Sequence, residues 1–353
     1  MGAGGTLVLG ASASLAWRYA TGSMSDYDRY TKILRAPPGE QPPIADLLRY
    51  AALAASGHNT QPWDFSVKGG RIDIVPDFGR RTPVVDPDDH HLFVSLGCLG
   101  ENLTIAARAV GYPGDIDVAP NGGKLSFIFG EGRLVHDPLF EAIGLRQSTR
   151  SLYDGRPVPV DDLTALQRLA AEPGVSLFLL TDRSNISRMR DLIVAGNDAQ
   201  MAESAFVKEL KHWIRFNPRG AMRAGDGLFS GASGNPSLPD ILADPAFSLF
   251  VTRQSENDKY ARQIKSTPTL AVFVGDKADP LHWIKIGRAC QRFMLAATAR
   301  GLKIACVNQP VEVPALRPEL AALVGEPDRR PDLVLRLGYA PALPYSPRRP
   351  VRL

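Results

Sequence analysis

The chain has 353 residues, 44% of them hydrophobic, with a formal net charge of +4 and a pI near 9.0. This length and apolar content predict a globular protein of two domains, or one large two-part domain, and exclude a wholly disordered chain. The Lys and Arg residues are dispersed, with no long basic run or nucleic-acid-binding signature, so the charge permits anionic ligands without indicating nucleic acid.

The first segment, residues 2–17 (GAGGTLVLGASASLAW), is apolar, rich in small residues and uncharged until Arg18. It is too short to span a bilayer and is similar to the apolar region of a signal peptide, although a positive start is missing. The alternative is a hairpin or helix packed on the body. Because residues 21–30 look like a polar linker, we treat 1–30 as a possible truncated signal or anchor, and export or tethering is favoured over the cytoplasm.

Residues 44–54 are apolar at helical spacing and predict a helix. The apolar helix is followed, before Trp63, by a run of uncharged residues that are mostly hydrogen-bonding: Ser56, Gly57, His58, Asn59, Thr60, Gln61. After this string, residues 65–67 and 71–75 predict a β-hairpin that turns through Lys68-Gly69-Gly70.

Two Ala-rich helices are predicted at 97–112 and 287–302, and their Gly and Ala residues recur at a constant offset of 190 (287 − 97). Both are followed by strand-like runs, 124–129 and 332–337, and 269–274 is another strand. The pattern predicts an α+β fold of two related halves, 31–140 and 141–353, with antiparallel sheets flanked by helices. Chance similarity of two Ala-rich helices is the alternative. A segment at 202–258, with a helix at 206–216 and a Gly/Ser/Pro-rich loop, is predicted to be an insertion, often a lid.

The string Arg146-Gln147-Ser148-Thr149-Arg150 has two interpretations. If it is extended, both Arg side chains and the Ser hydroxyl lie on one side and could clamp an anion. If it is a solvated helix entry, Ser148 is a cap, and spacing alone favours this second interpretation. Near the C-terminus, Arg348 and Arg349 belong to a proline-stiffened segment that could complete an anion site or form a free end.

Taken together, these strings resemble the nitroreductase-like flavoprotein superfamily, and more narrowly its single-chain duplicated, Acg-type branch, some of whose members carry twin-arginine export signals. The resemblance covers about residues 44–349. It is most specific in Ser56-x-x-Asn59-x-Gln61-Pro62-Trp63, then in Arg146-x-Ser148-x-Arg150, then in the segment from Gly338-Tyr339 to Arg349.

The resemblance implies an intramolecular pseudo-dimer that binds FMN between its halves. One half would contribute Arg146, Ser148, Arg150 and Arg348 or Arg349 to the phosphate, and the other Ser56, Gly57, His58, Asn59 and Gln61 to the flavin. A reciprocal site would need the same strings in the opposite halves, and neither the stretch before Ile44 nor the one after Ala171 contains them. One FMN per chain is therefore expected, and the protein would act as a monomer, with further oligomerisation left open.

No metal site is expected. The three cysteines are widely spaced, and His90-His91 follows an acidic turn in what we interpret as a solvated loop; Cys98 and Cys290 are interpreted as core thiols.

The implied function is an FMN-dependent oxidoreductase, in which the flavin carries the chemistry and catalytic side chains are not assigned. It would pass hydride from NADH or NADPH to a small-molecule acceptor such as a nitro compound or a quinone. The alternatives are FMN storage or sequestration with little turnover, and a specialised flavin dehydrogenase of a biosynthetic pathway. For localisation, the resemblance favours export of the twin-arginine type over the cytoplasm.

Overall fold

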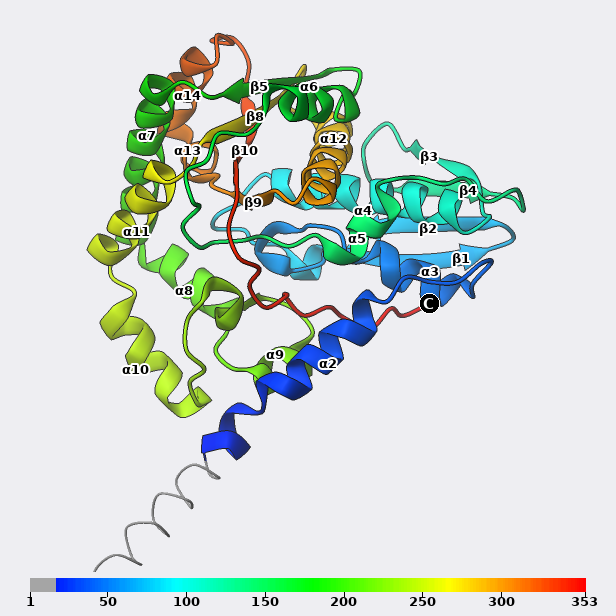
Figure 1. Ribbon diagram of the computed structural model, residues 1–353, viewed down its shortest axis with the longest axis horizontal. Coiled ribbons are helices and arrows are strands. Elements are labelled where there is room, and N and C mark those ends of the chain that lie inside the picture. Colours follow the sequence, from blue (N-terminus) through cyan, green and yellow to red (C-terminus); the bar gives the residue numbers. More distant parts are fainter. Residues whose placement is uncertain (1–16) are drawn as a thin grey trace, which may run out of the picture.

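The structure is a computed structural model that describes residues 17–353, apart from the side chain at position 244. The apolar segment at 2–17 of the predicted signal or anchor therefore lies, except for Trp17, outside the described residues. Two four-stranded antiparallel sheets form the frame, with helices between and around them (Figure 1). The predicted α+β fold with antiparallel sheets is confirmed.

The first sheet has the strand order β1-β2-β4-β3. Its members are β1 (Trp63–Lys68), β2 (Arg71–Pro76), β3 (Gly114–Val118) and β4 (Leu125–Phe129). The predicted hairpin is confirmed, with Lys68 opposite Arg71 across the turn. Helix α3 (Ile44–Ala51) precedes this sheet in the chain, and the long helix α4 (His90–Ala109) connects β2 to β3.

The second sheet has the order β5-β8-β10-β9. Its strands are β5 (Val175–Leu180), β8 (Thr269–Gly275), β9 (Lys303–Cys306) and β10 (Pro331–Gly338). Helix α6 (Val160–Leu169) precedes it, and α12 (Pro280–Ala299) connects β8 to β9. In both sheets the first, second, fourth and third strands of the chain therefore lie side by side, with a 20-residue helix between the second and third.

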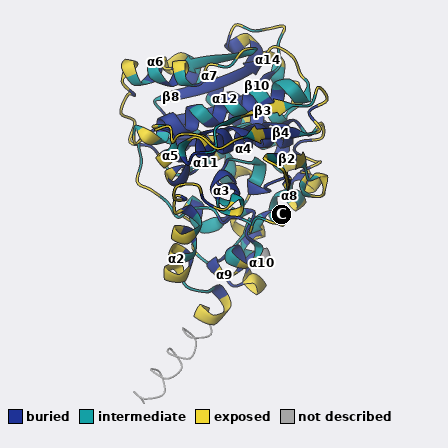
Figure 2. Cartoon of the chain, turned by 90° about the vertical axis from the view of Figure 1, so that its right-hand side faces the viewer, coloured by how far each residue is buried: buried dark blue, intermediate teal, exposed yellow. Residues whose placement is uncertain are grey.

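Helices α4 and α12 pack directly against each other in the middle of the molecule, where the residues are buried (Figure 2). A Cβ atom at Gly97 would lie 2.0 Å from the carbonyl oxygen of Ile284, and one at Gly287 would lie 2.0 Å from that of Val94. Only glycine permits this approach, since real Cβ atoms do not come so near. The two Ala-rich helices predicted from the sequence therefore exist and lie in close contact.

The two sheets differ in how they are covered. Strand β2 alternates, burying Ile72 and Ile74 against α4, whereas all seven residues of β8 are buried. Helices α7 (Arg183–Ala202) and α11 (Arg253–Lys265) cover the second face of β8, where Val272 and Val274 belong to a core of their own. A sheet covered on both faces needs a continuous apolar strand, which explains the run TLAVFVG.

Two predicted elements differ from the structure. Residues 21–30, interpreted as a linker, enter helix α2 (Met24–Arg35), in which Tyr27 is fully buried with its ring centroid 4.4 Å from that of Phe229. The helix expected at 206–216 is α8 (Ser204–His212), which ends before Trp213. The remaining elements are short: α5 (Phe140–Leu145), β6 (Ile214–Arg215), α9 (Pro218–Ala224), β7 (Leu228–Phe229), α10 (Asp240–Phe250), α13 (Gln309–Glu312) and α14 (Arg317–Leu323).

Among residues 17–353, no helix is both long and apolar enough to cross a membrane.

Candidate functional site

The loop that follows α3 has an unusual backbone. His58, Asn59 and Gln61 have φ values of +47°, +55° and +53°, in a region that residues with a Cβ rarely adopt. The Ser56 hydroxyl accepts a hydrogen bond from the Gln61 backbone N–H (3.2 Å), and the N–H of Gly57 donates to the hydroxyl of Ser95 in α4 (3.1 Å). Such strain persists only where surrounding contacts enforce it, and it concentrates at functional sites.

Three arginines meet beside this loop with their charges unneutralised. Arg35, Arg146 and Arg348 are all buried, and within the described part of the chain none forms an ion pair with a carboxylate. Burial lowers the pKa of each; Arg146 lowers the pKa of Arg35 further, to about 9, and both lower that of Arg348. An anion placed among them would relieve both burial and repulsion.

Backbone carbonyls at the end of α3 give these guanidinium groups part of their hydrogen bonding. Arg146 Nη2 donates to the Leu53 carbonyl (2.9 Å), and Arg348 donates to those of Ala52 (3.1 Å) and Leu53 (3.0 Å). The C-terminal end of a helix carries partial negative charge, which favours cations there. The Nε of Arg146 nevertheless remains buried without a partner.

The segment after β10 brings Arg348 to this place. It leaves the second sheet and runs across the molecule toward α2 and α3 (Figure 1). The hydroxyls of Tyr27 and Tyr30, both in α2, donate to the carbonyls of Tyr345 (2.6 Å) and Arg348 (2.8 Å). Arg348 Nη1 donates to the side-chain oxygen of Asn59 at 2.8 Å, which joins the C-terminal segment to the strained loop.

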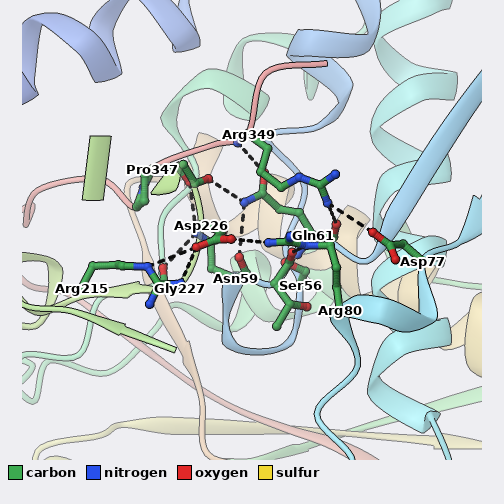
Figure 3. A network of polar contacts seen from close by, with 12 residues as sticks. Ser56, Asn59, Gln61, Asp77, Arg80, Arg215, Asp226, Gly227, Pro347 and Arg349 are labelled. Atoms are coloured by element: carbon green, nitrogen blue, oxygen red, sulfur yellow. Dashed lines mark hydrogen bonds and ion pairs between the residues drawn. The ribbon is translucent and has the colours of Figure 1, made fainter. Parts of the chain in front are cut away.

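Figure 3 shows the polar network that holds the loop to the C-terminal segment. The Gln61 side chain donates to the Gly225 carbonyl (2.9 Å) and accepts from the Arg349 backbone N–H (2.9 Å). The Arg349 guanidinium donates to the Gln61 carbonyl (2.8 Å) and lies 3.8 Å from Asp77. Gln61 and Arg349 therefore fasten the two segments together from outside the cavity described next.

A cavity of about 230 Å³ lies between the loop, α4, α12 and the C-terminal segment. Eight of the ten predicted cofactor-binding residues line it: Ser56, Gly57, His58, Asn59, Arg146, Ser148, Arg150 and Arg348. Residues 146–150 are not a helix entry but an extended stretch in which Ser148 bridges Ile304 of β9. The interpretation that spacing alone favoured is thus wrong, because pairing with β9 holds this segment extended.

One wall of the cavity comes from the segment between β5 and β8. Met201 lies at the end of α7, Phe206 and Leu210 lie on α8, and Glu256 and Tyr260 lie on α11. Part of this wall, including α8, belongs to the predicted insertion at 202–258.

The interpretation of His90-His91 as a solvated loop is wrong. Both residues are in the first turn of α4 and are buried, because Asp86 accepts hydrogen bonds from the N–H groups of His91 and Leu92 and starts the helix there. His90 Nε2 lies 3.0 Å from Asp332, and burial raises the pKa of that carboxyl to about 7. Asp86, His90 and His91 each place a ligand-type atom within 4.8 Å of the others, so the predicted absence of a metal remains a prediction.

The three cysteines, Cys98, Cys290 and Cys306, all line the cavity as free thiols. Burial raises the pKa of each, so they are neutral at physiological pH. This agrees with the interpretation of Cys98 and Cys290 as thiols of the packed interior.

Sequence reasoning missed four charged residues of this cavity: Arg35, His91, Glu256 and Glu312. Arg35 lies in a stretch that was searched only for a second Arg-x-Ser-x-Arg string. Its position at the end of a helix, before Pro37-Pro38, was the available signal. Glu312 could not be identified from the sequence, because the role of a single carboxylate depends on the residues that the fold brings close to it.

No protein-family profile matches the chain. Two proteins of Mycobacterium tuberculosis (strain ATCC 25618 / H37Rv) are similar to it over most of their length. "Putative NAD(P)H nitroreductase Rv3131" is 27% identical over 322 residues, which cover 87% of this chain and 89% of the relative. "Putative NAD(P)H nitroreductase acg" is 22% identical over 323 residues, which cover 87% and 93%. The chain is thus similar, over most of its length, to two proteins named as NAD(P)H nitroreductases.

Solved structures show weaker similarity. An iodotyrosine deiodinase bound to FMN and 3-iodo-L-tyrosine has a TM-score of 0.40 and 17% identity, covering 61% of this chain and 97% of that one. The nitroreductase NfnB of Mycobacterium smegmatis in complex with NADPH has a TM-score of 0.38 and 14% identity, covering 57% and 87%. Because these TM-scores are below 0.5, the similarity that matters for this chain is the one to the sequence relatives.

Proposed function

We propose that the chain binds one FMN in the cavity beside the strained loop. The observation that supports this most is the buried cluster of Arg35, Arg146 and Arg348, which lacks a carboxylate partner and has an unpartnered Nε. A phosphate monoester carries the charge and the acceptor oxygens that such a cluster requires. Ser148 and Arg150 line the same cavity and would add further donors.

The strained loop would contact the flavin ring. Ser56, Gly57, His58 and Asn59, none of which is an acidic residue, lysine or arginine, line the cavity. Burial lowers the pKa of His58 to about 4, so this imidazole is neutral at physiological pH. Neutral hydrogen-bonding groups suit the polar edge of an uncharged ring system. Gln61 and Arg349 would act indirectly, by holding the loop against the C-terminal segment.

The two halves, 31–140 and 141–353, would be products of a duplication and would form a pseudo-dimer. The shared strand order, the equivalent placement of α4 and α12 and their offset of 190 residues support this proposal. The cavity receives residues from both halves, as an interface site would.

Bound FMN would accept hydride from NADH or NADPH and pass it to an acceptor such as a nitro compound or a quinone. The chain's own residues would bind the phosphate, orient the ring and exclude water from the cavity. The relatives' names, which call them NAD(P)H nitroreductases, support the choice of donor and acceptor class.

A second candidate function is FMN storage with little turnover. The observation that favours it is the wall formed by Phe206, Leu210 and Tyr260, which lines the cavity and would keep a nicotinamide away if it lay over the flavin. If this wall stays closed over the flavin, hydride donors cannot stack on the ring.

One experiment separates these functions. The purified protein is loaded with FMN, freed of excess cofactor and mixed anaerobically with NADH or NADPH while the absorbance of oxidised flavin is followed. Bleaching by either nucleotide supports the oxidoreductase. Bleaching by dithionite alone supports storage. Protein that neither contains nor takes up FMN would contradict both.

We further propose that the protein is exported to the cell envelope, on the basis of the apolar, small-residue segment at 2–17. Fractionation of cells that produce the full chain, followed by N-terminal sequencing, tests this. Recovery of the intact chain from the cytoplasmic fraction alone would contradict it.

A further inference from the structure

A second charged group lies in the cavity, separate from the arginine cluster. His91 Nε2, on the first turn of α4, is 3.5 Å from Glu312 Oε1 on α13. Gln200, near the end of α7, donates to the other carboxylate oxygen of Glu312 at 2.7 Å. All three residues line the cavity, and the His91 side chain keeps 11% of its surface exposed there.

The surroundings of the pair hold its proton on His91. Burial alone would lower the pKa of His91, but Glu312 and Asp86 outweigh it and raise that pKa. Burial likewise would raise the pKa of Glu312, but His91 and Gln200 lower it. Both shifts favour the charged form of the pair, an imidazolium beside a carboxylate.

The other titratable groups near His91 do not replace it as a proton source. His58 interacts with the same carboxylate, yet its pKa is lowered to about 4, so it is neutral. Burial lowers the pKa of His90 well below its usual value. The Asp332 carboxyl faces His90, and the remaining neighbour, Arg330, disfavours protonation of His91.

Backbone contacts fix His91 relative to the strained loop. The hydroxyl of Ser95 donates to the His91 carbonyl at 2.6 Å and accepts from the Gly57 N–H at 3.1 Å. A Cβ atom at Gly57 would lie 3.6 Å from that of His91. His91 thus lies beside the loop proposed to contact the flavin ring.

We propose that His91 is the proton donor to the electron acceptor at this site, and that the acceptor is a compound reduced at oxygen, such as a quinone. This inference rests on the proposed function. Reduction of a quinone to a hydroquinone adds one hydride and one proton. The hydride and its electron pair come from the reduced cofactor. The proton comes from the His91 imidazolium and forms an O–H bond, leaving a neutral imidazole that solvent protonates again.

The test uses three variants of the full chain: His91→Gln, Glu312→Gln and, as a matched control, His282→Gln. His282 also pairs with a carboxylate, Asp279 at 2.7 Å, but it lies outside the cavity. FMN affinity is measured first by fluorescence quenching. The FMN-loaded proteins are then reduced with dithionite and mixed anaerobically with 1,4-benzoquinone across a range of pH.

We expect His91→Gln to bind FMN as the wild type does and to reoxidise about 10²-fold more slowly, the usual contribution of a positioned acid. The fall in the wild-type rate at high pH should disappear in this variant. An independent readout is NMR titration of histidine-labelled protein without cofactor. The His91 resonance should titrate above the ordinary histidine range, and Glu312→Gln should shift it down.

Each contrary outcome has a distinct meaning. Equal reoxidation by His91→Gln and His282→Gln would overturn the role of His91 while leaving the FMN site intact. So would a His91 resonance that titrates at or below the ordinary value, or a reduced wild type that the quinone does not reoxidise. Failure of the wild type to bind FMN would overturn the proposed function and this inference together.

Discussion

The α4/α12 helix pair has two flanks, and the polar side chains buried on each flank have different kinds of partner. On the flank that holds the cavity, Gln291 donates to Asn102 at 2.7 Å, and Asn102 donates to the carbonyl of Ala51, the last residue of α3. On the other flank the residues 190 positions away are charged: Arg292 lies 2.8 Å from Glu101 and donates to the carbonyl of Leu169, the last residue of α6.

The same contrast extends to the residues around each pair. On the second flank, a cavity of about 500 Å³ is lined by Arg288 and Arg292. Arg288 pairs with Glu101 at 2.9 Å, and Arg292 also pairs with Glu172 at 2.5 Å. Arg288 and Arg292, the two partly buried cations there, each have a carboxylate partner. On the first flank the amides are neutral, and among residues 17–353 the three buried arginines have no carboxylate partner. Buried positive charge without a carboxylate partner indicates that an anion would be stabilised on the first flank.

The backbone differs in the same sense. The loop after α3 holds three non-glycine residues at positive φ, whereas in the turn after α6 the positive φ falls on Gly174. Strain is tolerated on the flank with the cavity and avoided on the other. The difference in backbone strain therefore indicates a functional site on the first flank and a structural contact on the second.

The largest expected effect comes from breaking the ion pairs of the second flank. Glu101→Ala would leave Arg288 and Arg292 partly buried without their shared carboxylate, and we expect the free energy of unfolding to fall by about 3 kcal/mol. Urea denaturation of the cofactor-free protein measures this. The control is Asp154→Ala, which removes the partner of the exposed Arg156 and should leave the free energy of unfolding nearly unchanged. Equal losses would refute the contrast.

The next effect concerns the anion site. Arg146→Ala and Arg150→Ala should each weaken FMN binding by about 1.5–3 kcal/mol, as expected for charge-assisted hydrogen bonds. Equilibrium titration with FMN measures the change. Arg108→Ala, on the second flank, should leave the affinity unchanged. If both cavity variants bound FMN as tightly as the wild type, the phosphate would have to lie elsewhere.

A pH effect distinguishes the two imidazoles of the cavity. Because the pKa of His91 is raised, its stabilising contribution is present below about pH 6.5, the unfolded value, and is lost as pH rises through the folded pKa. The stability difference between wild type and His91→Gln should therefore shrink with rising pH. Since the pKa of His58 is lowered to about 4, His58 should cost stability as pH falls from 6.5 toward 4. Chemical denaturation at several pH values measures both effects. A change of the free energy of unfolding with pH in the opposite direction would contradict the prediction.

The smallest effect concerns backbone strain. His58→Gly would remove a Cβ from a positive-φ position, and we expect the cofactor-free protein to gain about 0.5 kcal/mol, the balance of relieved strain and the entropy of glycine. Thermal unfolding measures the gain. Ser148→Gly, at an extended position of the same cavity, should instead destabilise the protein. A loss in both variants would argue against strain in the loop.

Much of the fold could be predicted from local patterns. The alternation of β2, the continuous apolar run of β8 and the small residues of α4 and α12 each reflect one packing environment. Helix α2 could not be recognised, since its burial depends on Phe229, which lies some two hundred residues later.

The site was predictable where it consists of short strings. The loop at 56–61 and the stretch at 146–150 were both identified, and both line the cavity except at Thr60, Gln61 and Thr149. The extended state of the second string, and the meeting of His91 with Glu312, could not be predicted. Strand β9 and helix α13 impose them from distant parts of the chain.

The reach of the C-terminal segment has a consequence for biosynthesis. Asn59 and Arg348, which hydrogen-bond in the folded protein, are separated by 289 positions. At about 5–20 residues per second, a ribosome needs about 15–60 s to synthesise the chain between them. Throughout that interval the loop has neither its guanidinium partner nor the full positive cluster. The nascent chain can complete its first sheet early, but it becomes competent to hold a charged cofactor only once Arg348 has left the exit tunnel.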